Sequence, residues 1–327
     1  MLRLALIGTG GIATNYLRTL AAEHAAGRAT VAATCDLVEE RAAGAARPFG
    51  ARVYTDWRRC LEADRYDAVF VCVPPAAHSG QEELALERGA HVFVAKPVAL
   101  DLAYARRVLA AARSAGLLVS SGYMWRYSDL HAQIRGLLEG RPVGLVLGTY
   151  IHGLPGTPWW RRKAQSGGQM VEQTTHVFDL ARCFAGEVEA VSCLGARRLL
   201  ADVPNLDVED ASVCNLRFAS GAVGNIASCC AAERGGRADL ELVARDCLVR
   251  YRCGAGFRAW VDGGEREVRQ DVDPFAALVR GFLQAVRDGN AAGLLSPYAD
   301  AAQTLAVTLA AERSLARGGV PEAVERV

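Results

Sequence analysis

The chain has 327 residues, of which 51% are hydrophobic and 22% charged, and this length predicts two domains rather than one. Lys and Arg total 37 against 36 for Asp and Glu, a net charge of +1 that argues against the basic surface required for binding nucleic acid. No apolar run approaches the ~20 residues that span a bilayer and no leader pattern opens the chain, so we expect a cytoplasmic protein without nucleic-acid or membrane partners.

Short apolar runs alternate with helical stretches over residues 1–122, an order typical of a parallel sheet covered by helices on both faces. The strand-like runs are 2–7, 30–35, 68–73, 91–95 and 117–121. The helical stretches between them lie near 12–24, 38–47, 76–88 and 101–115. We therefore predict an α/β N-terminal Rossmann domain that binds a dinucleotide.

The pattern changes in residues 123–327, which we predict to be a substrate-binding and oligomerisation domain. A helix near 128–139, a strand near 145–153, a loop rich in Gly, Pro and Trp, and a helix near 171–185 come first. Alternating strands with turn signals follow from 188 to about 268, and they predict a large, mainly antiparallel, open-faced sheet in an α+β fold. Helices 274–288 and 297–316 end the chain, and the second could pack back on the first domain.

Lysine is scarce in this chain. Of the 37 basic residues only Lys96 and Lys163 are lysines. Arginine stays charged at any working pH, whereas the pKa of a lysine can be lowered until the amine exchanges a proton. Both lysines are therefore candidate functional residues, and composition does not choose between them.

A glycine-rich turn joins the first predicted strand to the first helix and contains Gly8, Gly10, Gly11 and Ile12. Glycine lets backbone amides approach a pyrophosphate, which the N-terminus of the helix also attracts. Asp36 ends the second strand, where a carboxylate accepts hydrogen bonds from ribose hydroxyls and repels a 2′-phosphate. NAD is therefore favoured over NADP; a helix-capping role for Asp36 is the compatible alternative.

Two further loops follow predicted strands at the same edge of the sheet. The first contains Val73, Pro74 and His78, and we interpret His78 as a structural or cofactor-wall residue rather than a catalyst. The second is Ala95-Lys96-Pro97, which places Lys96 at the strand end, facing the cleft. A solvated surface lysine is the alternative, and the scarcity of lysine argues against it.

Glu172 and His176 are four residues apart, a spacing that places them on one face of the predicted helix. The pair could be a surface pair or half of a metal site, but HExxH order and a third ligand are absent, so we expect no metal. A carboxylate can orient an imidazole and raise its basicity for taking a hydroxyl proton. We therefore interpret the pair as acid/base groups. No CxxC pair accompanies the ten cysteines, which we expect to be reduced core thiols.

Aromatic and basic residues gather on segments expected to border the cleft, where they could form the substrate wall: Trp125, Arg126, Tyr127, His152, Trp159 and Trp160. Aromatic faces stack on sugar and inositol rings, while Arg and His bond hydroxyls. Packing of loops over the cleft is the alternative for each of them. The loop with Trp159 and Trp160 could be a lid or a subunit contact, and the arginines after it could bind a carboxylate or phosphate.

In their order along the chain, these motifs resemble the Gfo/Idh/MocA oxidoreductases over nearly the whole length: GTGGIA, the Cys35-Asp36 strand end with Arg41, VPPAAH, AKP, GYMWRY at 122–127, and EQTTHVFDLAR. The resemblance implies that Lys96 and His176 flank the reacting hydroxyl carbon, with Glu172 beside them, and that Arg41 and Ala95 belong to the cofactor site. It also implies a homodimer or homotetramer through the open sheet face. Two departures stand out, since the family usually has Glu where Ala95 stands and many members have Asp at position 172.

The expected function is an NAD-dependent dehydrogenase or reductase acting on a secondary alcohol or ketone of a sugar, inositol or glycoside. Lys96 and His176 are the proton-transfer groups, and the sequence does not decide which is the immediate base. One alternative is redox-neutral epimerisation or glycoside cleavage. The other is a non-catalytic sugar- or NAD-sensing regulator of the same fold.

Overall fold

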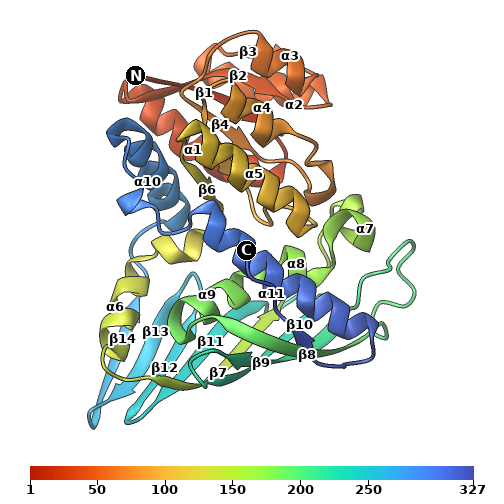
Figure 1. The fold of residues 1–327 in the computed structure, drawn as a ribbon, viewed down its shortest axis with the longest axis vertical. Coiled ribbons are helices and arrows are strands. Elements are labelled where there is room, and N and C mark those ends of the chain that lie inside the picture. The colour runs from red at the N-terminus through yellow and green to blue at the C-terminus, as the bar shows by residue number, and fades with distance from the viewer. The chain divides into compact units, whose positions relative to one another are not determined.

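The computed structural model describes residues 1–327, which divide into two compact units (Figure 1). Unit 1 comprises Met1–Tyr127 and Asp273–Ala301, and unit 2 comprises Ser128–Val272 and Ala302–Val327. The ranges predicted from the sequence, 1–122 and 123–327, differ from these units because they assign residues 273–301 to the second domain.

Unit 1 contains a six-stranded, fully parallel sheet in the order β3-β2-β1-β4-β5-β6. The strands are β1 (Leu2–Ile7), β2 (Ala29–Cys35), β3 (Arg52–Tyr54), β4 (Ala68–Val71), β5 (His91–Val94) and β6 (Val119–Ser121). Every residue of β4 is buried, as expected for a parallel strand with both faces covered. The predicted α/β class of this part is confirmed.

Five helices accompany this sheet: α1 (Gly11–Ala25), α2 (Glu39–Ala46), α3 (Trp57–Glu62), α4 (Gln81–Glu87) and α5 (Leu102–Ala115). The Asp56 carboxylate caps α3 and the Asp101 carboxylate caps α5, so both helices begin where a side chain satisfies free backbone N–H groups. The predicted helix near 76–88 is divided into a 3-10 turn η2 (Pro75–Ala77) and α4. His78 follows η2 in extended conformation, rather than lying in the first turn of a helix.

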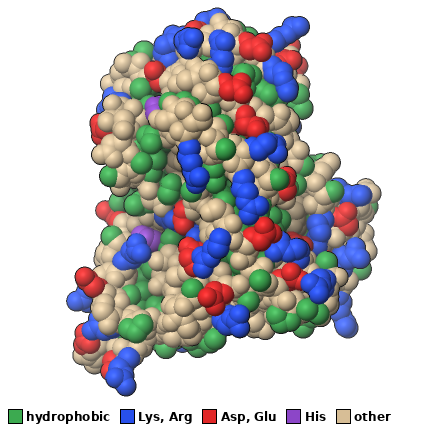
Figure 2. All heavy atoms as spheres, viewed as in Figure 1, with side chains coloured by type: hydrophobic (Ala, Val, Ile, Leu, Met, Phe, Trp, Pro, Cys, Tyr) green, Lys and Arg blue, Asp and Glu red, His purple; other side chains and the backbone are tan.

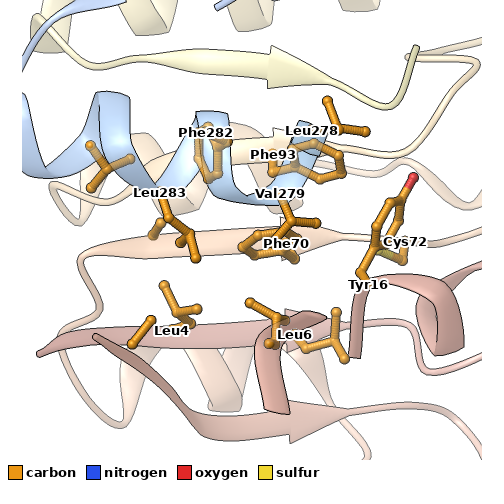
Figure 3. Close-up of a cluster of buried hydrophobic side chains, with 14 of the residues drawn as sticks. Leu4, Leu6, Tyr16, Phe70, Cys72, Phe93, Leu278, Val279, Phe282 and Leu283 are labelled. Atoms are coloured by element: carbon orange, nitrogen blue, oxygen red, sulfur yellow. The ribbon is translucent and has the colours of Figure 1, made fainter. Parts of the chain in front are cut away.

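Helix α10 (Pro274–Asp288) packs on this sheet although it comes late in the chain. Leu278, Val279, Phe282 and Leu283 form its apolar face, and all four are fully buried. They lie against side chains of β1, β4 and β5 in one cluster, where Phe282 faces Phe70 and Phe93 (Figure 3). This packing is the reason that residues 273–301 belong to unit 1. Helix α11 (Tyr298–Ala316) has its first turn in unit 1 and the rest in unit 2.

Unit 2 contains a nine-stranded sheet in the order β14-β13-β12-β11-β7-β10-β9-β8-β15, in which only β7 and β10 pair in parallel. The strands are β7 (Val143–Ile151), β8 (Val188–Ala196), β9 (Ala211–Phe218), β10 (Val223–Cys229), β11 (Arg237–Ala244), β12 (Cys247–Arg252), β13 (Gly256–Val261), β14 (Gly264–Arg269) and β15 (Glu322–Ala323). The predicted mainly antiparallel sheet is confirmed.

The helices of unit 2 are α6 (Asp129–Leu138), α7 (Lys163–Ser166), α8 (Gln169–Glu172) and α9 (Thr175–Ala185), together with most of α11. Helix α9 covers one face of the sheet so closely that a Cβ on Gly148 of β7 would lie 2.6 Å from Cγ1 of Val177. Residues 146, 148 and 150 of β7 therefore lie on the α9 face, and residues 145, 147 and 149 point to the opposite face.

The prediction of one continuous helix near 171–185 is wrong. The regular helical hydrogen-bond ladder is interrupted at Gln173 and Thr174, whose backbone N–H groups both donate to the Gln169 carbonyl. The Thr174 hydroxyl donates to Ser228 Oγ on β10 at 2.8 Å, which holds this break against the sheet. Glu172 consequently ends α8, and His176 lies in the first turn of α9.

No helix of the chain is both long and apolar enough to cross a lipid bilayer. On the face drawn in Figure 2, basic and acidic side chains are interspersed rather than gathered by sign. All ten cysteines are free, and three of them, Cys183, Cys229 and Cys253, are only half-buried.

Candidate functional site

The glycine turn between β1 and α1 has the geometry of an anion-binding elbow. Gly8 has φ 85°, and a Cβ there would lie 2.5 Å from the Cys72 carbonyl oxygen, so this position requires glycine. Gly10 precedes α1 without any side-chain cap, and a Cβ on Gly10 or Gly11 would meet no atom within 4 Å. The N-terminus of α1, where Ile12 is half-buried, is therefore open to a ligand. These residues fit the pyrophosphate of a dinucleotide.

Asp36 connects this elbow to the end of β2. Its Oδ2 accepts hydrogen bonds from the Thr9 backbone N–H at 2.8 Å and from the Thr9 hydroxyl at 2.9 Å. Its Oδ1 accepts from the backbone N–H of Val38, the residue that precedes α2. The carboxylate is thus held in one orientation at the carboxyl edge of the sheet, which fits a ribose-binding role. Arg41 lies exposed in the first turns of α2.

Two loops border the same edge beyond β1. Val73 and Pro74 follow β4, and the Val73 backbone nitrogen is 3.1 Å from the Cβ position of Gly8, so this loop touches the elbow. Ala95 and Lys96 follow β5, where the Ala95 N–H donates to the Val71 carbonyl and continues the ladder. Lys96 is thereby fixed at the strand end, half-buried, before a cis peptide bond to Pro97.

Lys163, the other lysine, has a structural environment in unit 2. Its Nζ lies 2.5 Å from a Glu209 carboxylate oxygen and 2.8 Å from one of Glu312. Its backbone N–H donates to Asp207. A compact ammonium between two carboxylates ties α7 to the loop before β9 and to α11. Lys163 is therefore explained by packing.

In unit 2 the structure brings together Glu172 and Trp160. The indole N–H of Trp160 donates to Glu172 Oε2 at 2.8 Å, and the ring is only 1% exposed in a small core with Val208 and Cys230. Trp159 packs half-buried against the same core. The buried Trp160 ring orients the Glu172 carboxylate. The sequence led us to expect Trp160 in the substrate wall, and its burial differs from that expectation.

Two further polar rings lie at the end of β7: Tyr150 belongs to the strand, and His152 follows it. Tyr150 and His152 stack with their ring centroids 4.6 Å apart. Burial, together with the charges of Glu172 and Cys253, raises the pKa of Tyr150 to about 12, which keeps the phenol protonated. Burial also lowers the pKa of His152, which favours the neutral ring. The sequence analysis missed Tyr150, although its spacing of two residues from His152 on a strand predicts the same face.

His176 lies near the start of α9 and is 6% exposed, with its backbone N–H bonded to the Gln173 carbonyl. Tyr150, Trp160, Glu172 and His176 therefore all belong to unit 2. No group of three or more His, Cys, Asp or Glu side chains is arranged to hold a metal ion.

Residues 124–127 form a 3-10 turn, η3, that holds the segment after α10. Arg126 is buried, forms an ion pair with Asp300 and donates to the Leu295 carbonyl. The Tyr127 hydroxyl accepts from the Leu295 N–H at 2.9 Å. These contacts give Arg126 and Tyr127 a packing role within unit 1, the kind of alternative that the sequence left open beside the substrate wall, while Trp125 is half-buried.

Comparison with known proteins identifies the family. Residues 2–123 match the model of the Gfo/Idh/MocA oxidoreductase family with an NAD-binding Rossmann fold, and residues 133–246 match the model of a Gfo/Idh/MocA C-terminal domain. The chain belongs to the Gfo/Idh/MocA oxidoreductase family. The predicted family and its NAD cofactor are thus confirmed, and the expectation of an oxidoreductase is confirmed at the level of the family.

Individual members of this family resemble the chain to different extents. It is 30% identical over 176 residues to the uncharacterized oxidoreductase YrbE of Bacillus subtilis, covering 53% of this chain and 52% of that protein. It is 28% identical to myo-inositol 2-dehydrogenase of Thermotoga maritima, covering 69% and 67%. The matches thus span about half to two thirds of these relatives. The solved structure of levoglucosan dehydrogenase with NADH and levoglucosan has a TM-score of 0.85 at 21% identity, covering 100% of both chains.

Proposed function

We propose that this protein is an NAD-dependent dehydrogenase or reductase that interconverts a secondary alcohol and a ketone on a sugar, inositol or glycoside. The observation that carries the proposal is the open glycine elbow tied to Asp36, in a chain of the oxidoreductase family. The substrate class rests on relatives whose names specify myo-inositol and levoglucosan. Gly8, Gly10, Gly11 and Asp36 hold the dinucleotide, whose bound nicotinamide supplies the hydride chemistry.

The residues of the chain provide the proton transfer in this proposal. Lys96 and His176 exchange the proton of the reacting hydroxyl, which leaves the oxygen when the alcohol is oxidised and returns when the ketone is reduced. Glu172 orients the imidazole, and Trp160 holds Glu172 by the indole hydrogen bond. Tyr150, which lies near the charge of Glu172, and His152, which stacks on Tyr150, supply neutral polar groups suited to bonding substrate hydroxyls. Many members of the family have Asp at position 172. In this chain the longer side chain of Glu172 reaches the indole N–H of Trp160.

The test is a search for hydride transfer across a panel of inositols, aldoses and glycosides with NAD+, followed by the matching ketones with NADH. We expect a change in the near-ultraviolet absorbance of NADH with at least one class. With substrate deuterated at the carbon oxidised, the label should appear on the nicotinamide. Product without net NADH would instead support epimerisation or glycoside cleavage. Tight binding of NAD and sugar without any transfer across the panel would support a sensor and contradict the proposal.

We also propose that two copies of the chain associate through the sheet face of unit 2 opposite α9. Four large apolar side chains, between 41% and 64% exposed, lie on that face according to the strand registers: Leu147, Leu194, Val213 and Val223. Exposed large apolar side chains on one sheet face are typical of an interface. Light scattering after size exclusion should give a dimer or tetramer, and Leu147→Asp should shift it towards monomer. Leu199→Asp, at a loop leucine that is 57% exposed, is the control; a monomeric wild-type chain would refute the proposal.

A further inference from the structure

A buried network in unit 1 surrounds His78. Nδ1 of His78 lies 2.5 Å from Oε1 of Glu82, whose side chain is fully buried. The Tyr104 hydroxyl donates to Oε2 of Glu82 at 2.5 Å and accepts from the backbone N–H of Gly80 at 3.0 Å. Both carboxylate oxygens of Glu82 are therefore hydrogen-bonded, one to His78 and one to Tyr104.

This network specifies how the imidazole is protonated. A carboxylate only accepts hydrogen bonds, so the proton between Glu82 and His78 belongs to Nδ1. Burial alone would raise the pKa of Glu82, but the charge and hydrogen bond of His78 and the hydrogen bond of Tyr104 hold that pKa below its ordinary value. Glu82 is the only hydrogen-bond partner of the ring, which leaves Nε2 as the nitrogen for a ligand.

The order of the strands indicates which part of the ligand lies near Nε2 of His78. The strands run β2-β1-β4, and ligands of such folds bind outside the carboxyl ends where the strand order reverses, here between β1 and β4. Asp36 after β2 serves the adenosine ribose, and the elbow after β1 serves the pyrophosphate. The loop after β4, which carries His78 and touches the elbow, therefore borders the other half of the dinucleotide.

We propose that Glu82 and Tyr104 are positioning residues for the cofactor: they hold His78 with Nδ1 turned inward, so that Nε2 bonds a ribose hydroxyl of the nicotinamide half. A hydroxyl both donates and accepts, so it suits this nitrogen whether the ring is neutral or charged. The inference deepens the proposed function and rests on its cofactor site. Its tests use spectroscopy and binding, so they remain decisive if no substrate is ever turned over.

The first test is the nitrogen-15 spectrum of the histidine rings in the whole protein, with His78→Gln used to assign the signal among six histidines. With the ring neutral, His78 should carry its proton on Nδ1. Glu82→Leu, which removes the acceptor, should move the proton to Nε2, whereas Glu82→Gln retains an acceptor and should keep the Nδ1–H form. A wild-type ring protonated on Nε2 would overturn the proposal without any variant.

The second test compares NADH with ADP, which lacks the second ribose and the nicotinamide. Glu82→Leu should weaken NADH binding about 3–10-fold, the effect of one lost hydrogen bond, and leave ADP binding within about twofold. Glu82→Gln should restore most of the NADH affinity, and Glu82→Leu should add nothing to His78→Gln. Glu87→Leu, at an exposed position of α4, is the matched control. Equal weakening of both ligands would mean that Glu82 only stabilises the fold, and the proposal would then fail.

Discussion

Replacement of Lys96 by methionine is expected to lower the turnover number at least about 100-fold while NADH binding survives, because general acid–base groups typically contribute ~10²–10⁴-fold. Lys96 sits at the end of β5, where the Ala95 N–H bonds Val71 and the Gly122 N–H bonds Val94, so its backbone is held from both neighbouring strands. Methionine retains the length of the side chain and removes only the amine. Single-turnover kinetics with the substrate found in the panel, beside NADH fluorescence titration, separate the two effects.

Lys96→Arg distinguishes proton transfer from simple charge. Arginine keeps the positive charge but does not release its proton at any working pH, so this variant should be nearly as impaired as Lys96→Met. Recovery of most activity by arginine would mean that Lys96 acts only as a cation. Turnover close to wild type in the methionine variant would remove Lys96 from the mechanism altogether.

Phe282→Ala is expected to reduce the free energy of unfolding of unit 1 by about 3–5 kcal/mol, the range for deleting a buried aromatic side chain. The Phe282 ring is fully buried and lies 5.6 Å, centroid to centroid, from both Phe70 and Phe93. Its loss leaves a cavity between α10 and the parallel sheet that the remaining side chains fill only in part. Urea unfolding measures this free energy. The transition of unit 1 is the one that moves to higher urea concentration when NADH is added, because a ligand stabilises the unit that binds it.

Val53→Ala, at a 38% exposed position of β3 in unit 1, is the control and should change stability by less than about 0.5 kcal/mol. An equally small effect of Phe282→Ala would show that α10 does not belong to the core of unit 1. A large effect would establish that a helix near the end of the chain completes the nucleotide-binding fold.

A spacing of four residues between an acid and a histidine occurs three times in the chain, and two of these pairs show the limit of local patterns. Between Glu172 and His176 it predicted one continuous helix, yet the helical hydrogen bonds are interrupted at Gln173 and Thr174, where the Thr174 hydroxyl bonds Ser228 on a distant strand. Between His78 and Glu82 it attracted no attention, and there the two side chains form a buried contact. Spacing alone does not distinguish these cases, because contacts with residues far away in the chain determine the local backbone conformation at each pair.

Strands and helices with long apolar runs and strong turn signals were predicted well, because their backbone hydrogen bonding and side-chain periodicity depend on residues close together in the chain. Strand β1 and helix α10 have their predicted bounds. Strand β3, with three residues of which two are exposed, and the six-residue α3 were missed because neither buries enough apolar surface to leave a pattern.

The sequence by itself determined the two fold classes, the glycine elbow with its acidic residue at the end of β2, and the family, because each depends on neighbouring residues or on motifs kept in order. Only the tertiary structure decided that Lys163 is structural, that Trp160 holds Glu172, that Arg126 pairs with Asp300 and that α10 belongs to unit 1. The physical reason is the same for all four: burial and ion pairing join residues far apart in the chain, and their partners exist only once the sheets have formed.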